Sequence, residues 1–145
     1  MADITSFSNF KQVGIVVKDI EKAINGLTNL GIGPFNPLDA EPTVRWEEHG
    51  KPTEIKIKSR FAHIGPVEIE LIEPISECMQ KEFLDEKGDG IHHIGFYVDD
   101  IDKEVELMKD KGYRVVQRGW RPTVGGYAYF DTEESCGIML EIIQR

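Results

Sequence analysis

Four polar residues, at corresponding places in the two halves of this 145-residue chain, have the chemistry of a divalent metal site. They supply one imidazole, two carboxylates and one amide oxygen: Gln12, Glu70, His93 and Glu141. The set is hard and rich in oxygen, so it suits Mn, Co, Ni, Mg or Fe(II) better than a structural zinc site, which prefers thiolates. The sequence leaves the identity of the metal open, Zn included.

The correspondence rests on a repeat at a constant offset of 81 residues. Between 12–31 and 93–112, 6 of 20 positions are identical, and the glycines fall in register. Both halves also end alike, in ELI at 70–72 and EII at 141–143. We interpret this pattern as an internal duplication, in which Gln12 of the first copy aligns with His93 of the second.

The hydrophobic pattern predicts the same order of elements in each half. Short runs rich in β-branched residues indicate strands, and apolar residues at helical spacing indicate helices. Expected strands span 13–17, 43–49, 54–63, 66–72, 91–98, 114–120, 127–131 and 138–143, and expected helices span 20–30, 76–87 and 101–111. The prediction is a single α+β domain over 1–145, with βαβββ modules at 8–74 and 91–145 joined by a helix within 75–90.

Alternation along a strand decides which side chains share a face. In the first strand Val13, Ile15 and Val17 face the helix, so Gln12 faces the opposite way. The same rule turns Glu70, His93 and Glu141 away from the helices. If the sheet curls, this face becomes a cavity.

Other residues near these four strands have simpler expected roles. Gly14 and Gly95 lie on the same face, where a missing side chain would leave room for a ligand. We expect His92 to serve structure or an interface and Glu68 to be peripheral. The alternative interpretation is that Glu70 and Glu141 are ordinary solvated charges and His93 a structural histidine.

Composition excludes several classes of function. The net charge of −9 and the pI of about 4.9 argue against a nucleic-acid-binding surface. Two cysteines without metal-type spacing favour a reducing cytoplasm. We see no secretory signal and no apolar run of the roughly 20 residues that a membrane-spanning helix needs.

The motifs GIVVKDIEKA, VEIELIEP, EFLDEKGDGIHHIGFYVDDI, RPTVGG and LEII resemble the vicinal oxygen chelate superfamily of glyoxalases, bleomycin-resistance proteins and ring-cleaving dioxygenases. They are most similar to its methylmalonyl-CoA epimerase-like branch. The resemblance implies two βαβββ modules in a curved, partly open barrel-like sheet around a metal cleft, with Gln12, Glu70, His93 and Glu141 at the ligand positions. The chain departs from the epimerases at Gln12, where they usually have histidine, in a longer segment before ELIEP, and in DTEESCG, which lacks their His-Pro-Lys pattern.

The resemblance also implies a function, namely epimerisation of methylmalonyl-CoA or a related 2-substituted acyl thioester by α-proton transfer through a metal-stabilised enolate. Glu141 would be one base and Glu48 the second, with Glu47 as the fallback. Arg121 and Arg118 are candidates for binding the phosphates of an acyl-CoA. A homodimer is implied in the same way.

Two other functions remain open at this stage. A glyoxalase I-like lyase would use the same proton transfer on a thiol adduct, and a bleomycin-resistance-type protein would bind a small molecule without catalysis. Gln12 favours the binder, because an amide is a weaker ligand than imidazole. It disfavours an extradiol dioxygenase, which needs histidine at the start of both modules.

Overall fold

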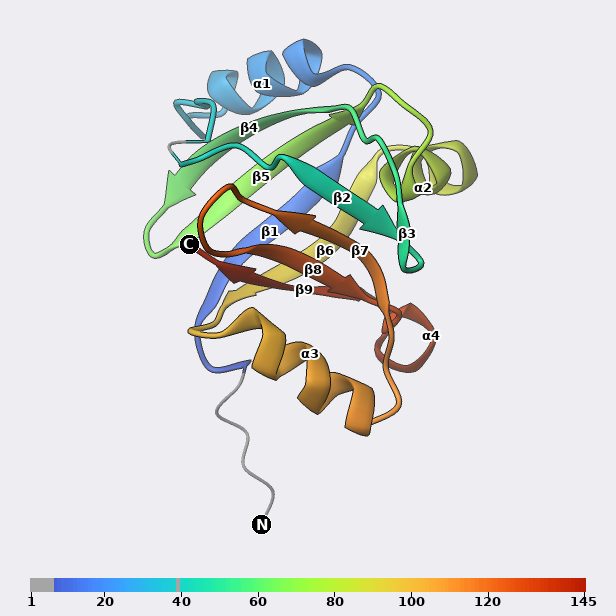
Figure 1. The fold of residues 1–145 in the computed structure, drawn as a ribbon. Helices are drawn as coiled ribbons and strands as arrows, with labels where there is room; N and C mark the ends of the chain where they lie inside the picture. The colour runs from blue at the N-terminus through green and yellow to red at the C-terminus, as the bar shows by residue number, and fades with distance from the viewer. Residues whose placement is uncertain (1–6, 39) are drawn as a thin grey trace. The chain divides into compact units, whose positions relative to one another are not determined.

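The computed structural model describes residues 7–38 and 40–145 (Figure 1). The chain divides into two compact units, and each is described by itself. The unit that we call the His93 unit comprises 12–39 and 55–93, and the Glu141 unit comprises the rest of the chain. The division falls inside strands β1 (Phe10–Val16) and β6 (Gly90–Tyr97), so each of these strands contributes residues to both units.

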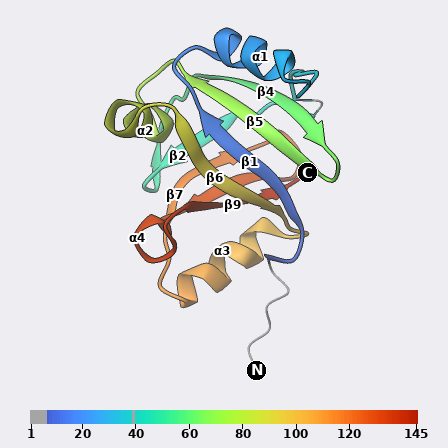
Figure 2. The same cartoon turned by 180° about the vertical axis from the view of Figure 1, so that it is seen from behind.

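The His93 unit is a small sheet covered by a helix. Strand β5 (Val67–Pro74) runs parallel to β1 and antiparallel to β4 (Ile57–Ile64). Helix α1 (Ile20–Asn29) begins where the carboxylate of Asp19 accepts a hydrogen bond from the Lys22 N–H. Its apolar side packs on this sheet (Figure 2), in a core that includes Ile20 and Leu71. Helix α2 (Met79–Lys87) then leads into β6.

The Glu141 unit repeats this plan on a larger sheet. Five of its strands follow the order β3-β2-β7-β8-β9. Their bounds are Arg45–Glu48 for β2, Lys51–Pro52 for β3, Val115–Trp120 for β7, Gly126–Phe130 for β8 and Met139–Gln144 for β9. Helix α3 (Ile101–Asp110) lies along this sheet (Figure 1). It packs on a core that includes Ala128, Phe130 and Ile142, and a short α4 (Glu133–Cys136) precedes β9.

The repeat seen in the sequence extends to backbone hydrogen bonds. In the His93 unit the Val17 N–H donates to the Ile72 carbonyl at 2.8 Å, and in the Glu141 unit Val98 donates to Ile143 at 2.9 Å. Asp100 caps α3 at Lys103 as Asp19 caps α1. The strand that precedes each helix therefore has the same register against the strand that ends each module.

The α+β class is confirmed, and the expected elements form with small shifts at their ends. The strand expected at 43–49 is β2, which pairs with β7 and so belongs to the Glu141 unit. Its hairpin to β3 turns through His49 and Gly50, both with positive φ, as a two-residue loop requires. The sequence did not predict β3 and α4, because two and four residues are too short to show periodicity. Within the described ranges no helix is long and apolar enough to cross a bilayer.

Candidate metal and proton-transfer residues

The His93 unit holds a buried polar group that we call the His93 cluster: Gln12, Glu68, Glu70, His92 and His93. All five are at most 8% exposed, and His93 is fully buried. Strands β1 and β5 pair Gln12 with Glu68 and Gly14 with Glu70, so their side chains share one face as the alternation predicted. The Nε2 atom of His93 lies 3.5 Å from a carboxylate oxygen of Glu70.

The amide of Gln12 has a defined orientation within this cluster. Its Nε2 donates to a carboxylate oxygen of Glu68 at 2.8 Å, and its Oε1 lies 2.7 Å from Nε2 of His93. A carboxylate only accepts hydrogen bonds, so Glu68 fixes the NH2 group on its own side. The carbonyl oxygen of Gln12 is therefore turned toward His93. The sequence suggested that Glu68 is peripheral. That expectation is wrong, because Glu68 orients this oxygen.

His92 lies against the other side of the His93 ring. The two Nδ1 atoms are 3.0 Å apart, and His92 also forms a T-shaped contact with Phe83, with ring centroids 5.0 Å apart. Burial, reinforced by the neighbouring His93, lowers the pKa of His92 to about 3, so this ring is neutral near pH 7. At this distance one Nδ1 donates and the other accepts, and the tautomers of the two rings decide which. The structural role expected of His92 is therefore to contact His93, the candidate metal ligand.

Gly14 has a different role from the one that the sequence suggested. A Cβ atom at this position would clash with the ring of His93. The missing side chain leaves room for the imidazole, and not for a ligand, which corrects the expectation. Gly14 lets the fully buried ring lie across β1.

The Glu141 unit carries a second set, which we call the Glu141 row: Glu48, Gln117, Tyr129 and Glu141. Neighbouring strands pair Glu48 with Gln117, Gln117 with Tyr129, and Tyr129 with Glu141. Directly paired residues project from the same face of a sheet, so the four side chains form a line across β2, β7, β8 and β9. Both predicted bases, Glu48 and Glu141, therefore lie on one face of this unit.

The fallback base and one candidate arginine lie on the opposite face. Glu47 pairs with Arg118 on the neighbouring strand, and Arg118 pairs in turn with Ala128. Ala128 belongs to the core under α3, so this row of residues lies on the helix side of the sheet. The guanidinium of Arg118 forms an ion pair with Asp102 of α3 at 2.5 Å. The register therefore distinguishes Glu48 from Glu47, a distinction that the sequence left open.

Arg121 lies just beyond β7, near the last residues of the chain. Its guanidinium donates to the Gln144 carbonyl at 3.3 Å. Burial and the nearby Arg145 lower the pKa of Arg121 from its usual value. Because two guanidinium groups repel each other, an anion placed between them would be favoured. Arg121 remains a candidate for a phosphate or carboxylate group.

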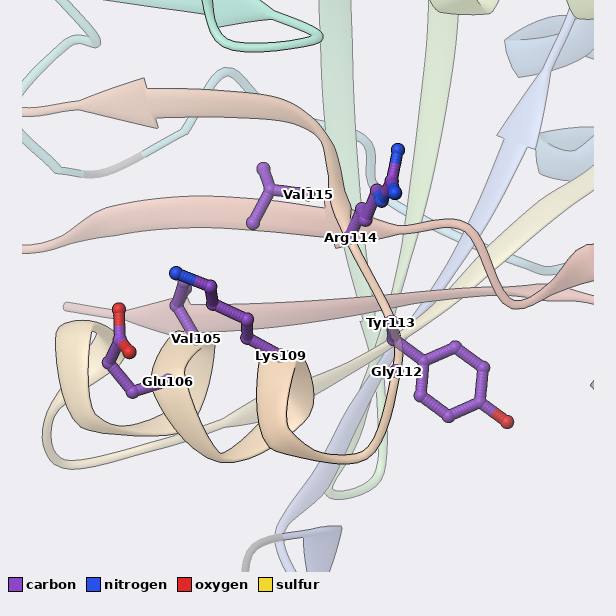
Figure 3. Close-up of a pocket in the computed structure, with 7 residues that line it drawn as sticks. All are labelled: Val105, Glu106, Lys109, Gly112, Tyr113, Arg114 and Val115. Carbon is purple, nitrogen blue, oxygen red and sulfur yellow. The ribbon is translucent and has the colours of Figure 1, made fainter.

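A surface cavity of about 610 Å³ lies between α3 and the start of β7 (Figure 3). Its cationic side chains are Lys109 and Arg114, and Figure 3 shows them extending in different directions from the ribbon. No residue of the two polar sets lines it. Because its cations do not converge, this cavity is a poor candidate for the phosphates of a substrate.

Sequence reasoning missed two residues, Gln117 and Tyr127, that hydrogen bonds connect to a predicted base. Gln117 is fully buried, its Nε2 donates to Glu48 at 2.7 Å, and its Oε1 accepts from the Tyr127 hydroxyl at 2.8 Å. The signal was a polar residue in the middle of an apolar strand, VVQRGW. Its partner could not be predicted, because β2 lies far from β7 in the sequence.

The His93 cluster has the donor set that a divalent cation requires. It presents an imidazole nitrogen and a carboxylate oxygen 3.5 Å apart, with an amide oxygen oriented toward the imidazole. Carboxylates taken out of water require a compensating positive charge or proton. Imidazole and oxygen ligands in a buried setting fit Mn, Co, Ni, Fe(II) or Zn.

Comparison with known proteins identifies the family of the chain. The family model described as "Glyoxalase/Bleomycin resistance protein/Dioxygenase superfamily" matches residues 11–130, and the chain belongs to this superfamily. An uncharacterized Bacillus subtilis protein, YqjC, is 26% identical over 130 residues, which cover 83% of this chain and 93% of YqjC.

Solved structures share the fold at low identity. Methylmalonyl-CoA epimerase from Mycobacterium tuberculosis superposes with a TM-score of 0.70 at 21% identity, covering 99% of this chain and 92% of the epimerase. A single-residue variant of the Streptomyces coelicolor epimerase, in complex with 2-nitronate-propionyl-CoA, gives a TM-score of 0.69 at 20% identity, covering 96% and 95% of the two chains. The fold is therefore the glyoxalase-like fold of these epimerases.

Proposed function

We propose that this protein is a metal-dependent epimerase of methylmalonyl-CoA or a related 2-substituted acyl thioester. The observation that carries the proposal is the Glu141 row, which aligns two carboxylates, Glu48 and Glu141, on one face of a sheet. An epimerase that inverts a carbon needs one base for each face of that carbon. The epimerases that share the fold provide the substrate class, since one was solved in complex with methylmalonyl-CoA.

Glu141 is proposed as the third strong metal ligand, beside His93 and Glu70. The matching backbone bonds, Val17 to Ile72 and Val98 to Ile143, imply the same register in both modules. Gly14 lies opposite Glu70 in the His93 unit, so Gly95 is expected opposite Glu141 in the other. His93 is two residues before Gly95 on β6 and projects from the same face. A divalent cation held by these residues and Oε1 of Gln12 would supply Lewis-acid stabilisation of negative charge on a substrate oxygen.

The two carboxylates then divide the proton transfer. One glutamate takes the α-hydrogen as a proton, and the electron pair of the broken C–H bond delocalises into the thioester carbonyl, giving an enolate. The other glutamate, protonated, gives its proton to the opposite face, and a new C–H bond forms there. Each turnover exchanges the protonation states of Glu48 and Glu141, so the pair can work in either direction. In this scheme Glu141 switches between the roles of metal ligand and base.

The remaining parts of the proposal concern recognition and assembly. Arg121 is proposed to meet the phosphates of the acyl-CoA, because burial and the charge of Arg145 lower its pKa and an anion would offset that repulsion. Arg118 is the weaker candidate, since Asp102 already balances its charge. A homodimer remains a prediction that light scattering of the purified protein would check.

The test is deuterium wash-in at the α-carbon of methylmalonyl-CoA in heavy water, with protein loaded with Mn, Co or Ni. We expect exchange and inversion in the wild type, and loss of inversion in both Glu48→Gln and Glu141→Gln. Absence of exchange with every acyl-CoA tried would refute the epimerase. Turnover of a glutathione hemithioacetal in its place would assign the protein to the glyoxalase I type of lyase.

A non-catalytic binding protein of the bleomycin-resistance type is the second candidate. Gln12 bridges Glu68 and His93 through two short hydrogen bonds, so the cluster forms a connected network from protein groups alone. Such a network would be stable without metal. Protein that stays metal-free after dialysis against Mn, Co and Ni, with an unchanged melting temperature, would favour the binder.

A further inference from the structure

The buried amide of Gln117 connects the predicted base Glu48 to a tyrosine two strands away. Gln117 is fully buried on β7, directly opposite Glu48 of β2. Its Nε2 donates to Oε2 of Glu48 at 2.7 Å. Its Oε1 accepts from the hydroxyl of Tyr127, on β8, at 2.8 Å. The three groups form one chain of hydrogen bonds that ends on the carboxylate.

This chain has only one chemically consistent direction. The ionised carboxylate of Glu48 can only accept, so the NH2 end of the Gln117 amide must face it. The Tyr127 hydroxyl donates to the other end and so opposes rotation of the amide. A reversed amide would put its oxygen against the carboxylate, so it would lose the bond to Glu48 and leave two acceptors facing each other.

The sheet provides space for this arrangement at Gly119. A Cβ atom at Gly119 would clash with the ring of Tyr127. The missing side chain lets that ring lie across β7, and its hydroxyl thereby reaches the amide two residues earlier on the strand. The Tyr127 ring also forms a T-shaped contact with the Tyr129 ring, with centroids 5.3 Å apart, which restrains it further.

From this geometry we propose that Gln117, oriented by Tyr127, is a positioning residue that holds Glu48 for proton transfer. The inference rests on the proposed epimerase function. A neutral amide fixes the direction of the carboxylate without adding the positive charge that would make it a weaker base. Glu47 illustrates the contrast, because it forms an ion pair with Arg45 at 3.4 Å on the opposite face. Of the two adjacent glutamates, the amide of Gln117 therefore positions Glu48 and not Glu47.

The first test does not depend on activity. Crystal structures of the wild type and of Gln117→Leu would compare the carboxylate of Glu48 in the two proteins. We expect it within hydrogen-bonding distance of the amide in the wild type and turned away, or in several conformers, in the variant. A Glu48 carboxylate that keeps its position without the amide would overturn the inference, whether or not the protein proves to be an epimerase.

The second test uses the two enantiomers of methylmalonyl-CoA separately in heavy water. If Glu48 loses its position, one enantiomer faces no working base, while the other still exchanges its α-hydrogen at Glu141. We expect Gln117→Leu to slow inversion at least tenfold while one enantiomer keeps its exchange at close to the wild-type rate. Equal slowing of both enantiomers would contradict a selective role for Gln117 at Glu48, whereas no exchange in the wild type would refute only the epimerase.

Tyrosine variants provide a matched control, and they also serve if Gln117→Leu fails to fold. Tyr127→Phe removes the hydroxyl that orients the amide, so it should slow inversion a few-fold. As in Gln117→Leu, one enantiomer should keep its exchange rate. Tyr113→Phe removes a hydroxyl that lies 3.1 Å from Ser135, away from both polar sets, and should leave inversion unchanged. Identical rates in these two variants would refute the orienting role of Tyr127.

Discussion

The His93 cluster and the Glu141 row use similar residues in different geometries. The cluster is compact: its five side chains are all at most 8% exposed, and three of them contact the imidazole of His93 at 2.7 to 3.5 Å. The row is extended, because its four residues lie on four successive strands and Glu48 at its far end is only half-buried. A compact buried set of donors suits an ion that must stay in place. A carboxylate at the partly open end of a line suits a proton that must move.

The two regions nevertheless use the same local devices. In each, a buried glutamine donates its NH2 group to a glutamate, Gln12 to Glu68 and Gln117 to Glu48. In each, a glycine makes room for a ring, Gly14 for His93 and Gly119 for Tyr127. The difference lies in what the amide oxygen meets, which is an imidazole in the cluster and a phenol in the row. That difference places the single imidazole of the proposed metal site in the cluster, whereas the row contributes only the carboxylate of Glu141.

The largest predicted effect comes from filling the two glycines. Gly14→Ala should destabilise the protein by about 3 kcal/mol or more, because His93 is fully buried and has nowhere to move. Gly119→Ala should cost less, since Tyr127 is only partly buried and can shift outward. Urea unfolding of both variants would measure the difference.

A third glycine provides the control for that comparison. Gly26 lies within α1, and a Cβ atom there would meet nothing within 4 Å. Gly26→Ala should therefore stabilise the protein by up to about 1 kcal/mol. If Gly14→Ala proved as harmless as Gly26→Ala, the His93 ring could not lie across β1 as described.

The second prediction separates metal binding from proton transfer. His93→Gln should weaken binding of Mn or Co at least about 100-fold, ~2.7 kcal/mol, because it removes the single imidazole of the proposed ligand set. Glu48→Gln should leave the affinity within about twofold, since Glu48 is at the far end of the row from Glu141. Titration calorimetry on metal-stripped protein would measure both. Equal losses in the two variants would mean that the cluster and the row are not functionally separate.

The sequence predicted the faces of the strands better than their partners. Alternation alone placed Gln12 and Glu70 on one face, because a strand has a period of two whatever it pairs with. The choice between Glu48 and Glu47 needed the pairing of β2 with β7, which lie far apart in the chain. Gly14 was misinterpreted for the same reason, since the ring that occupies its space belongs to another strand.

The third prediction uses the buried His92. Its pKa in the folded protein is about 3, below the ordinary 6.5, so the unfolded chain takes up a proton at His92 before the folded one does. The stabilisation from neutral His92 is therefore complete above about pH 6.5 and decreases as the pH falls toward 3. By pH 4.5 the loss would approach ~3 kcal/mol, at about 1.4 kcal/mol per pH unit.

A variant isolates the histidine from the carboxylates that also titrate in this range. His92→Gln keeps a polar side chain that does not titrate, so its free energy of unfolding should fall less steeply between pH 6.5 and 4.5. Chemical unfolding at several pH values would give both slopes. If the unfolding free energies of the wild type and His92→Gln fell in parallel, His92 would take up its proton over the same pH range in the folded and unfolded protein. That result would conflict with its burial against His93.

The smallest effect, and the sharpest for the cluster, is expected at Gln12. Gln12→His replaces a weak amide ligand by imidazole and leaves Glu68 to accept the second ring N–H, an arrangement that strengthens metal-binding histidines. We expect metal affinity to rise about tenfold, ~1.4 kcal/mol, in a calorimetric titration with Co or Mn. Adding Glu68→Gln should remove most of that gain, because the new imidazole would lose its anionic acceptor. An unchanged affinity in Gln12→His would mean that residue 12 does not contact the metal, and the amide would then serve only to connect Glu68 with His93.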